Sequence, residues 1–314
     1  MAKVNTVLGP IDTADLGTAL THEHLFAGPA GSYRDFPELL DPQVFNIVVD
    51  GLKTAKAGGI DTIVDATTAD LGRDVEFLAE ASRASGVNVL ACTGWWLDFP
   101  RFFEGISPDQ LADVFTREIE VGISGTDIKA GILKSASDME GVTPDGAVVL
   151  RAIARAYHRT NVPIMLHSYA PGQVARQQLA ILDEEGVPMN RIKVDHPLSS
   201  TDEEYLTWLL DQGCFLSMDS FPGMGVSPRA RAQTMKRLMD AGYADRLCPS
   251  HDIVQARIKV ARPMISDEER LKANPHGYLY IHKEIFPMLK EMGASDEELN
   301  RLCVAGPRGF FEGA

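Results

Sequence analysis

Two histidines stand two residues apart at the end of an apolar run, in the sequence GTALTHEHLF at residues 17–26. If this segment is a β-strand, His22 and His24 project to the same face, because alternate residues of a strand share a face. Two neutral imidazoles side by side form a pair that can bind a metal ion. The pair alone is weak, so a metal site requires further ligands from elsewhere in the chain.

Four more residues that can do such chemistry interrupt other apolar runs. Lys134 lies in AGILKSA, His167 in PIMLHSY, His196 in IKVDHPL and Asp252 in RLCPSHD. A single core histidine is usually a hydrogen-bonded structural residue, but packing does not easily explain the whole set. Imidazole and carboxylate groups suit a divalent metal, with zinc as the first choice and manganese, cobalt or iron as alternatives.

The apolar runs recur along the chain with amphipathic, helix-like segments between them. Near-continuous Val, Ile and Leu are typical of parallel strands buried on both faces, and a glycine after a periodic segment is a usual helix stop. The runs span residues 18–24, 61–68, 88–96, 130–136, 163–169, 192–198, 214–221 and 246–252. Eight alternations of strand and helix favour an α/β fold of the (β/α)8 TIM-barrel type over an open doubly wound sheet.

The candidate residues fall where this fold carries its chemistry. Active sites of such barrels lie at the C-terminal ends of the strands. The candidate residues all lie at such ends, namely His22, His24, Lys134, His167, His196 and Asp252. We expect one barrel domain over residues 1–314, with a long loop after the eighth strand at about residues 253–277. Long loops at this end of a barrel usually shape the active site.

Lys134 does not fit the set as an ordinary ammonium group. An ammonium cannot ligate a metal, and it would repel the cations that the other side chains attract. The residue fits if it is deprotonated, or if carbon dioxide has converted it to a carbamate. A carbamate is anionic and can bridge two metal ions, and the sequence leaves both states open.

The ordered set resembles the amidohydrolase superfamily and, within it, the phosphotriesterase family. HxH ends the first strand, Lys the fourth, His the fifth and sixth, and Asp the eighth. The resemblance extends over almost the whole chain and includes GPIDTADLGTALTHEHLF, GIDTIVDATT, ACTGWW, DIKAGILKSA, QQLAILDEEGV, SHD and GPRGFF. It implies two divalent metal ions bridged by carboxylated Lys134 and a hydroxide. One ion would be held by His22, His24 and Asp252, and the other by His167 and His196.

The resemblance also implies a reaction. The hydroxide between the metals would attack a lactone or ester carbonyl, with Asp252 as both ligand and proton acceptor. Promiscuous hydrolysis of phosphotriesters is expected, because attack on phosphorus needs the same groups. Trp96 resembles a pocket tryptophan of the phosphotriesterases proper and favours the alternative that organophosphate triesters are the main substrates. His251 resembles the lactonase branch, and Tyr169 and Phe221 complete the expected substrate pocket.

The sequence also departs from the family pattern. Family members usually have Gly-His on the sixth strand and an acid soon after, where this chain has Asp195 and Ser199. Ser220 stands where the family usually has histidine or arginine. The proton relay is therefore altered, which leaves open a metal-binding but catalytically weak ligand-binding protein. We expect Asp195 to face away from the site as an ordinary strand residue.

The composition limits the partners. A formal net charge of -14 argues against nucleic acid and anionic membranes, which require basic surfaces. No apolar stretch approaches the roughly 18 residues of a membrane span, and the N-terminus has no apolar secretory core. The four cysteines form no CxxC pair. We expect a cytoplasmic protein with a small-molecule substrate, and the resemblance implies a homodimer through the loops after the third and fourth strands.

Overall fold

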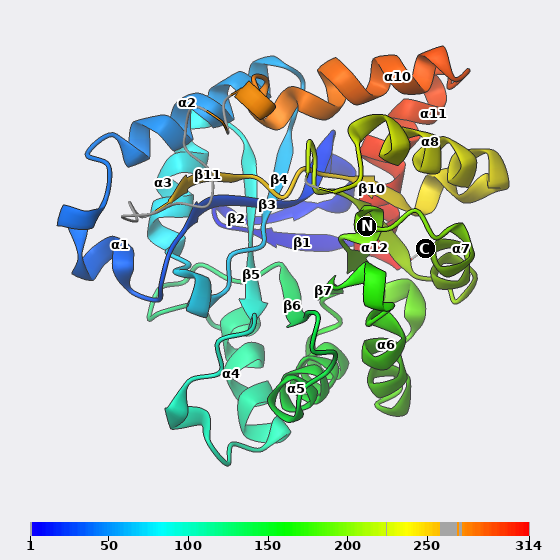
Figure 1. Ribbon diagram of the computed structural model, residues 1–314. Helices are drawn as coiled ribbons and strands as arrows, with labels where there is room; N and C mark the ends of the chain where they lie inside the picture. Colours follow the sequence, from blue (N-terminus) through cyan, green and yellow to red (C-terminus); the bar gives the residue numbers. More distant parts are fainter. Residues whose placement is uncertain (1, 224, 258–268, 270–271, 314) are drawn as a thin grey trace.

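A parallel β-sheet forms the centre of the molecule, and helices cover its outer face (Figure 1). The computed structural model describes residues 2–223, 225–257, 269 and 272–313. The strands of this sheet are β3 (Ala19–Ala27), β4 (Thr62–Asp65), β5 (Asn88–Gly94), β6 (Ile132–Ser137), β7 (Ile164–Ser168), β8 (Ile192–Asp195), β9 (Phe215–Met218), β10 (Leu247–Pro249) and β11 (Val254–Arg257). All eight strands expected from the sequence are present, within a few residues of their predicted limits.

The sheet closes on itself because β10 and β11 are consecutive halves of one stave. β10 pairs with β9, whereas β11 pairs with β3, and both pairings are parallel. Between the halves, the Asp252 N–H donates to the carbonyl of His22 at 3.1 Å, and the His24 N–H donates to the carbonyl of Ile253 at 2.8 Å. Nine strands thus make eight staves, and the predicted (β/α)8 barrel is confirmed.

Helices follow the strands in the predicted alternation. They are α1 (Ser32–Asp35), α2 (Val44–Ala57), α3 (Val75–Ser85), α4 (Pro108–Glu120), α5 (Pro144–Thr160), α6 (Ala175–Glu184), α7 (Glu203–Asp211), α8 (Pro228–Leu238), α10 (Phe286–Glu291), α11 (Asp296–Asn300) and α12 (Gly306–Glu312). Local sequence explains several of their starts. α4 begins with a capping box between Ser107 and Gln110, and Asp74 caps α3 by accepting from the Phe77 N–H at 3.0 Å.

The bottom of the barrel is apolar and closed by the two ends of the chain. An antiparallel hairpin, β1 (Lys3–Thr6) with β2 (Gly9–Asp12), was not expected from the sequence. Apolar side chains from the barrel strands, the N-terminal segment and α12 fill the barrel interior below the ligand residues, and they include Val4, Leu16, Val64, Leu90, Ile132, Met165, Phe215, Cys248, Phe310 and Phe311. Figure 1 shows the two termini near each other beside α12. The apolar floor leaves the opposite end of the barrel for polar chemistry.

The segment expected as a long loop after the eighth strand begins and ends with regular structure. β11 occupies Val254–Arg257, and a 3-10 turn begins at Gly277. Residues 258–268 and 270–271, most of this loop, lie outside the described residues. Among the helices of the described part of the chain, none is both long and apolar enough to cross a membrane.

Gly94, the last residue of β5, allows the backbone to approach the candidate lysine closely. Its φ is +124°, and a Cβ added there would lie 1.9 Å from the carbonyl oxygen of Lys134. Gly94→Ala is therefore expected to lower the free energy of unfolding by about 1–3 kcal/mol, and more if the strands separate. Urea denaturation measures this loss.

Gly59→Ala is the matched control for Gly94→Ala. Gly59 has a similar φ of +95°, but an added Cβ there would meet no atom within 4 Å. The control therefore carries the backbone strain without the steric clash. Equal losses of stability in the two variants would contradict the close approach to Lys134.

Candidate metal centre

A β-bulge turns the first two candidate ligands into the barrel. Leu20 of β3 pairs with Ile63 of β4, and Glu23 pairs with Asp65. Between these two pairs β3 advances by three residues and β4 by only two, so β3 contains one extra residue. Leu20 packs in the outer core between sheet and helices. Unbroken alternation would place every second residue after it on the same outer face. The extra residue reverses the alternation, and His22 and His24 face inward with ring centroids 5.5 Å apart.

The other candidate ligands share the inward face of their strands with the apolar floor. Lys134 follows Ile132 by two residues on β6, and His167 follows Met165 by two on β7. His196 directly follows β8, and Asp252 comes three residues after the end of β10. The floor residues and the ligand residues are thus successive layers of one barrel interior.

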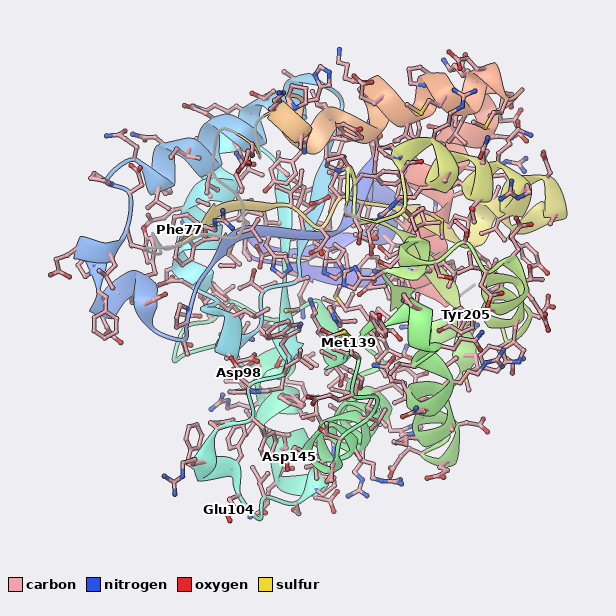
Figure 2. The ribbon with its side chains drawn as sticks, viewed as in Figure 1. Phe77, Asp98, Glu104, Met139, Asp145 and Tyr205 are labelled. Carbon is pink, nitrogen blue, oxygen red and sulfur yellow. The ribbon has the colours of Figure 1, made fainter. Side chains whose placement is uncertain are left out.

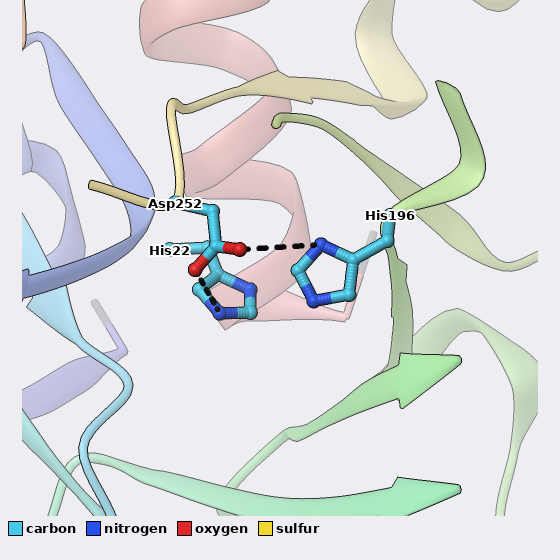
Figure 3. Close-up of side chains that lie close together, drawn as sticks. All are labelled: His22, His196 and Asp252. Atoms are coloured by element: carbon cyan, nitrogen blue, oxygen red, sulfur yellow. Dashed lines mark ion pairs between the residues drawn. The ribbon is translucent and has the colours of Figure 1, made fainter. Parts of the chain in front are cut away.

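Asp252 lies close to His22, His24 and His196, and Figure 3 shows it with His22 and His196. Its Oδ1 is 3.5 Å from His22 Nε2 and 3.4 Å from His24 Nε2, and its Oδ2 is 3.9 Å from His196 Nδ1. Ligand atoms of His22, His196 and Asp252 all lie within 4.8 Å of one another. Atoms at this spacing can share one cation after small side-chain rotations.

Lys134 and His167 complete the group. The Lys134 Nζ is 3.3 Å from His22 Nε2 and donates to the carbonyl of Ala66 at 3.0 Å. The His167 Nδ1 is 2.9 Å from His196 Nε2. The structure therefore brings all six sequence-predicted ligands together at one end of the barrel.

Three residues of this region adopt a left-handed backbone that non-glycine residues rarely use. His196, Ser220 and Asp252 have φ values of 61°, 64° and 58°, each just after the C-terminal end of a barrel strand. Such conformations are held by the surrounding structure and concentrate at functional sites. They turn the chain sharply, so that side chains at the strand ends point over the barrel.

Each of three imidazoles has an oxygen beside its Nδ1 atom. His24 Nδ1 is 2.7 Å from Thr67 Oγ1, and His196 Nδ1 is 3.0 Å from Asp219 Oδ1. His22 Nδ1 is 3.1 Å from Asp195 Oδ2. Oxygen partners of this kind fix the ring orientation and the tautomer of metal-binding histidines.

Burial and neighbouring charges set the protonation of the group. Burial, then Lys134, lowers the pKa of His22 well below its usual value. Burial would also lower the pKa of His196, but Asp219 and Asp252 outweigh it and raise this pKa to about 9. His22 therefore has the neutral ring that metals bind, whereas His196 would have to release a proton to bind one.

Asp195 corrects a sequence expectation, because it faces into the site rather than away from it. On β8 the apolar residues Ile192 and Val194 pack outward against the helices, so Lys193 and Asp195 occupy the inward positions. Asp219 was not singled out as a site residue, yet it is fully buried beside His196. Its sequence signal was its place two residues after Ser217, on the inward face of the strand.

The four expected pocket residues separate into two pairs. Trp96 follows β5, and its ring lies 6.0 Å from that of His167 in an edge-on arrangement. Tyr169 follows β7 and is half-buried, with its ring against Gly172. Trp96 therefore lies at the candidate metal centre, and Tyr169 follows the end of the strand that carries His167.

Phe221 and His251 are instead buried and contact other residues of the protein interior. Phe221 is 2% exposed and stacks on Tyr280 at 6.5 Å. His251 is 1% exposed, with Nδ1 2.8 Å from Glu23 Oε1 and Nε2 accepting from the Ile281 N–H at 3.2 Å. Both ring nitrogens of His251 have protein partners, so this placement differs from the pocket role that its resemblance to the lactonase branch implies.

The altered relay positions carry hydroxyl groups. The Ser220 Oγ donates to Asp219 Oδ1 at 2.9 Å and lies 3.2 Å from His196 Nδ1. Ser199 ends the short 3-10 turn after β8. Neither hydroxyl titrates near neutral pH, so neither can replace a carboxylate or an imidazole as a proton carrier.

Comparison with known proteins identifies the family. The sequence profile of the phosphotriesterase family matches residues 2–311. The chain is 37% identical over 331 residues to a phosphotriesterase homology protein of Mycobacterium tuberculosis, covering 99% of this chain and 98% of the relative. It is 34% identical over 308 residues to an aryldialkylphosphatase of Saccharolobus solfataricus, covering 96% of each, and 27% identical over 352 residues to an N-acetyltaurine hydrolase of Xenopus tropicalis, covering 98% and 97%. The chain belongs to the phosphotriesterase family.

Proposed function

We propose that the chain is a binuclear metal-dependent hydrolase of lactones or other neutral esters, with promiscuous activity toward phosphotriesters. The coarse assignment to a phosphotriesterase-family hydrolase rests on the family match and on the buried His/Asp cluster. The observation that carries the proposal is the convergence of four histidines, Lys134 and Asp252 at the C-terminal end of the barrel.

The donor set fits two divalent ions. Four imidazole nitrogens and a carboxylate suit zinc, and also manganese, cobalt or iron. We propose that His22, His24 and Asp252 hold one ion and that His167 and His196 hold the other. The oxygen partners beside the Nδ1 atoms of His22 and His24 support this division, because they leave both Nε2 atoms directed at Asp252.

Lys134 fits the same set if its amine has reacted with carbon dioxide. The amine nitrogen would form a bond to the carbon of carbon dioxide and lose a proton, giving a carbamate anion. Its present position, 3.3 Å from His22 Nε2 in a site 1% exposed, supports this proposal, because an anion there would balance two cations.

Asp252 is the carboxylate placed to move a proton. Bound divalent ions supply an activated water and polarise the scissile bond. The side chain of Asp252 is 33% exposed, whereas those of Asp195 and Asp219 are 0% exposed. Asp252 can therefore accept a proton from the attacking water and release it to solvent, and the other two carboxylates serve to orient histidines.

A hollow of mixed polarity lies beside Trp96 at the centre. Its volume is about 640 Å³, which is in the range of small-molecule sites. The loop after β5 and the start of α5 line it, and two of its lining residues, Asp98 and Asp145, are labelled in Figure 2. Trp95, Trp96, Phe99 and Val149 supply apolar surface that suits an acyl chain or an aromatic group.

A substrate panel tests the assignment. Zinc-loaded protein is given γ- and δ-lactones of varied acyl chain, aryl esters, paraoxon-like triesters and N-acetyltaurine, and kcat/KM is compared. We expect lactones to be the best substrates. Triesters that exceed lactones by more than about tenfold would make organophosphates the main substrates, as the relative named aryldialkylphosphatase suggests. A strong preference for N-acetyltaurine, which is an amide, would reject both lactones and triesters as the main substrates.

Ser199 and Ser220 motivate a second candidate of another class, a metal-binding protein that binds a ligand but turns it over weakly. Calorimetry with unreactive lactone analogues separates the two. Tight binding without turnover of any ester, lactone, triester or amide would favour the binding protein, whereas turnover of any of them favours the hydrolase.

Exposed apolar side chains on the loops after β5 and β6 lead us to propose a homodimer. Phe102 is 79% exposed, Met139 73% and Leu97 38%. Burying these groups against a second copy would remove an apolar surface from water. Sedimentation velocity of the wild type and of Phe102→Glu tests this, and an unchanged monomer in both would reject it.

We also propose a cytoplasmic location, since all four cysteines are free and buried.

A further inference from the structure

A buried ion pair lies directly beneath the candidate metal centre. Lys193 and Asp195 are both 0% exposed, and the Lys193 Nζ donates to Asp195 Oδ1. The second oxygen of this carboxylate, Oδ2, is 3.1 Å from His22 Nδ1. Within the described residues, neither His22 Nδ1 nor Asp195 Oδ2 makes a well-aligned hydrogen bond to any atom. Leaving two such buried atoms unpaired is costly, and at 3.1 Å a small rotation of the His22 ring would pair them with each other.

The two nitrogens of His22 face different groups. Nε2 faces Lys134 and Asp252, at 3.3 and 3.5 Å. Nδ1 faces two carboxylates, Asp195 at 3.1 Å and Asp219 at 3.9 Å. A nitrogen beside carboxylate oxygens carries the proton of a neutral imidazole, so the lone pair lies on Nε2.

We propose that Asp195 is a positioning residue that holds His22 as the Nδ1–H tautomer with its Nε2 lone pair toward the metal ligands. Lys193 fixes the Asp195 carboxylate within the barrel by donating to its Oδ1. This inference rests on the proposed function only in treating His22 as a metal ligand. Asp195 touches neither substrate nor metal in this role and acts through His22 alone.

The same carboxylates could be read as ligands of a separate cation. Ligand atoms of His22, Asp195 and Asp219 all lie within 4.8 Å of one another. The ammonium of Lys193 already occupies Asp195, and it would repel a cation bound beside it. The geometry therefore favours an orienting role for Asp195 over a ligand role.

Asp195→Asn tests the inference, because the amide keeps the shape and removes the charged acceptor. Zinc affinity is measured by competition with a chromophoric chelator, and the tautomer of His22 in metal-free, ¹⁵N-histidine protein by long-range ¹H–¹⁵N NMR. The His22 signals are assigned from their loss in His22→Asn. We expect zinc binding about 10–100-fold weaker and a loss of the pure Nδ1–H pattern.

Glu118→Gln is the matched control. Glu118 is also a buried carboxylate paired with a cation, accepting from both terminal nitrogens of Arg73 at 2.8 Å, but it lies away from the histidines. It should leave zinc affinity and the His22 pattern unchanged. If Asp195→Asn does not fold, Lys193→Met/Asp195→Leu removes the pair without leaving a buried charge, and the same weakening of zinc binding is expected.

The outcomes separate this inference from the proposed function. Wild type that binds zinc, with Asp195→Asn and the double variant within threefold of it and an unchanged tautomer, overturns the role of Asp195 but leaves the hydrolase intact. Loss of one zinc equivalent with no change in the tautomer also overturns it, in favour of a ligand role. If the wild type binds no zinc, but the Asp195→Asn variant loses the Nδ1–H pattern of His22, the orienting contact is supported and the metal centre is rejected.

Discussion

Lys134→Ala is expected to remove most of the bound zinc and to lower kcat/KM on the preferred substrate by on the order of a thousandfold or more. The Lys134 Nζ lies among the candidate ligands, 3.3 Å from His22 Nε2, so its loss removes the group that we propose bridges two ions. The strand itself should survive, because Leu133, which packs outward against the helices, and Ile132, which packs in the barrel interior, both remain. Inductively coupled plasma mass spectrometry and the substrate panel measure the two losses.

Carbon dioxide gives this prediction a sharper form. Metal-free wild type held without carbon dioxide should take up zinc slowly, and added bicarbonate should speed uptake, because the carbamate forms from carbon dioxide and the free amine. Lys134→Ala should show no response to bicarbonate, and circular dichroism should report an intact barrel. A variant that keeps two zinc ions per chain and activity within tenfold of wild type would contradict the bridging role of Lys134.

The barrel could be predicted because its staves are written as buried apolar runs. The runs containing β3 to β10 are bounded by turns or amphipathic segments, so their number and order followed from the sequence. β11 could not be found in this way, since Val254–Arg257 reads VQAR and is only half-buried. The β1–β2 hairpin is short and only partly buried, and no apolar run marks it.

The ligands were visible in the sequence, but their supports were not. On β8 the order Ile-Lys-Val-Asp alternates apolar and polar residues, which in most sheets places the polar ones in solvent. In this barrel the helices cover the outer face, so Ile192 and Val194 pack outward and the polar pair is enclosed. The alternation itself was the missed signal for Lys193 and Asp195.

Backbone turns decided the remaining differences. His196, Ser220 and Asp252 use left-handed conformations, which glycine and asparagine favour, so residue type gave no warning of them. The turn at Asp252 sends His251 beneath it, toward Glu23 and the Ile281 amide, while Asp252 itself points at the histidines. Adjacency in sequence therefore did not mean a shared role.

Lys193→Met is expected to cause the largest loss of stability, about 3–5 kcal/mol in the free energy of unfolding of metal-free protein. The methionine fits the apolar surroundings, but it leaves the Asp195 carboxylate buried without its cation. Urea denaturation of metal-free protein measures the change without any contribution from bound zinc.

Two further variants isolate the reason for that loss. Lys56→Met removes the cation of an exposed pair, in which Lys56 and Asp61 are 42% and 41% exposed at 2.9 Å, and should change stability by no more than about 1 kcal/mol. Lys193→Met/Asp195→Leu removes both buried charges and should recover most of the stability that Lys193→Met loses. The recovered protein should still bind zinc weakly, because His22 lacks its orienting carboxylate. A single variant as stable as Lys56→Met, or a double variant no more stable than Lys193→Met, would mean that the charge of Asp195 is not what Lys193 holds in place.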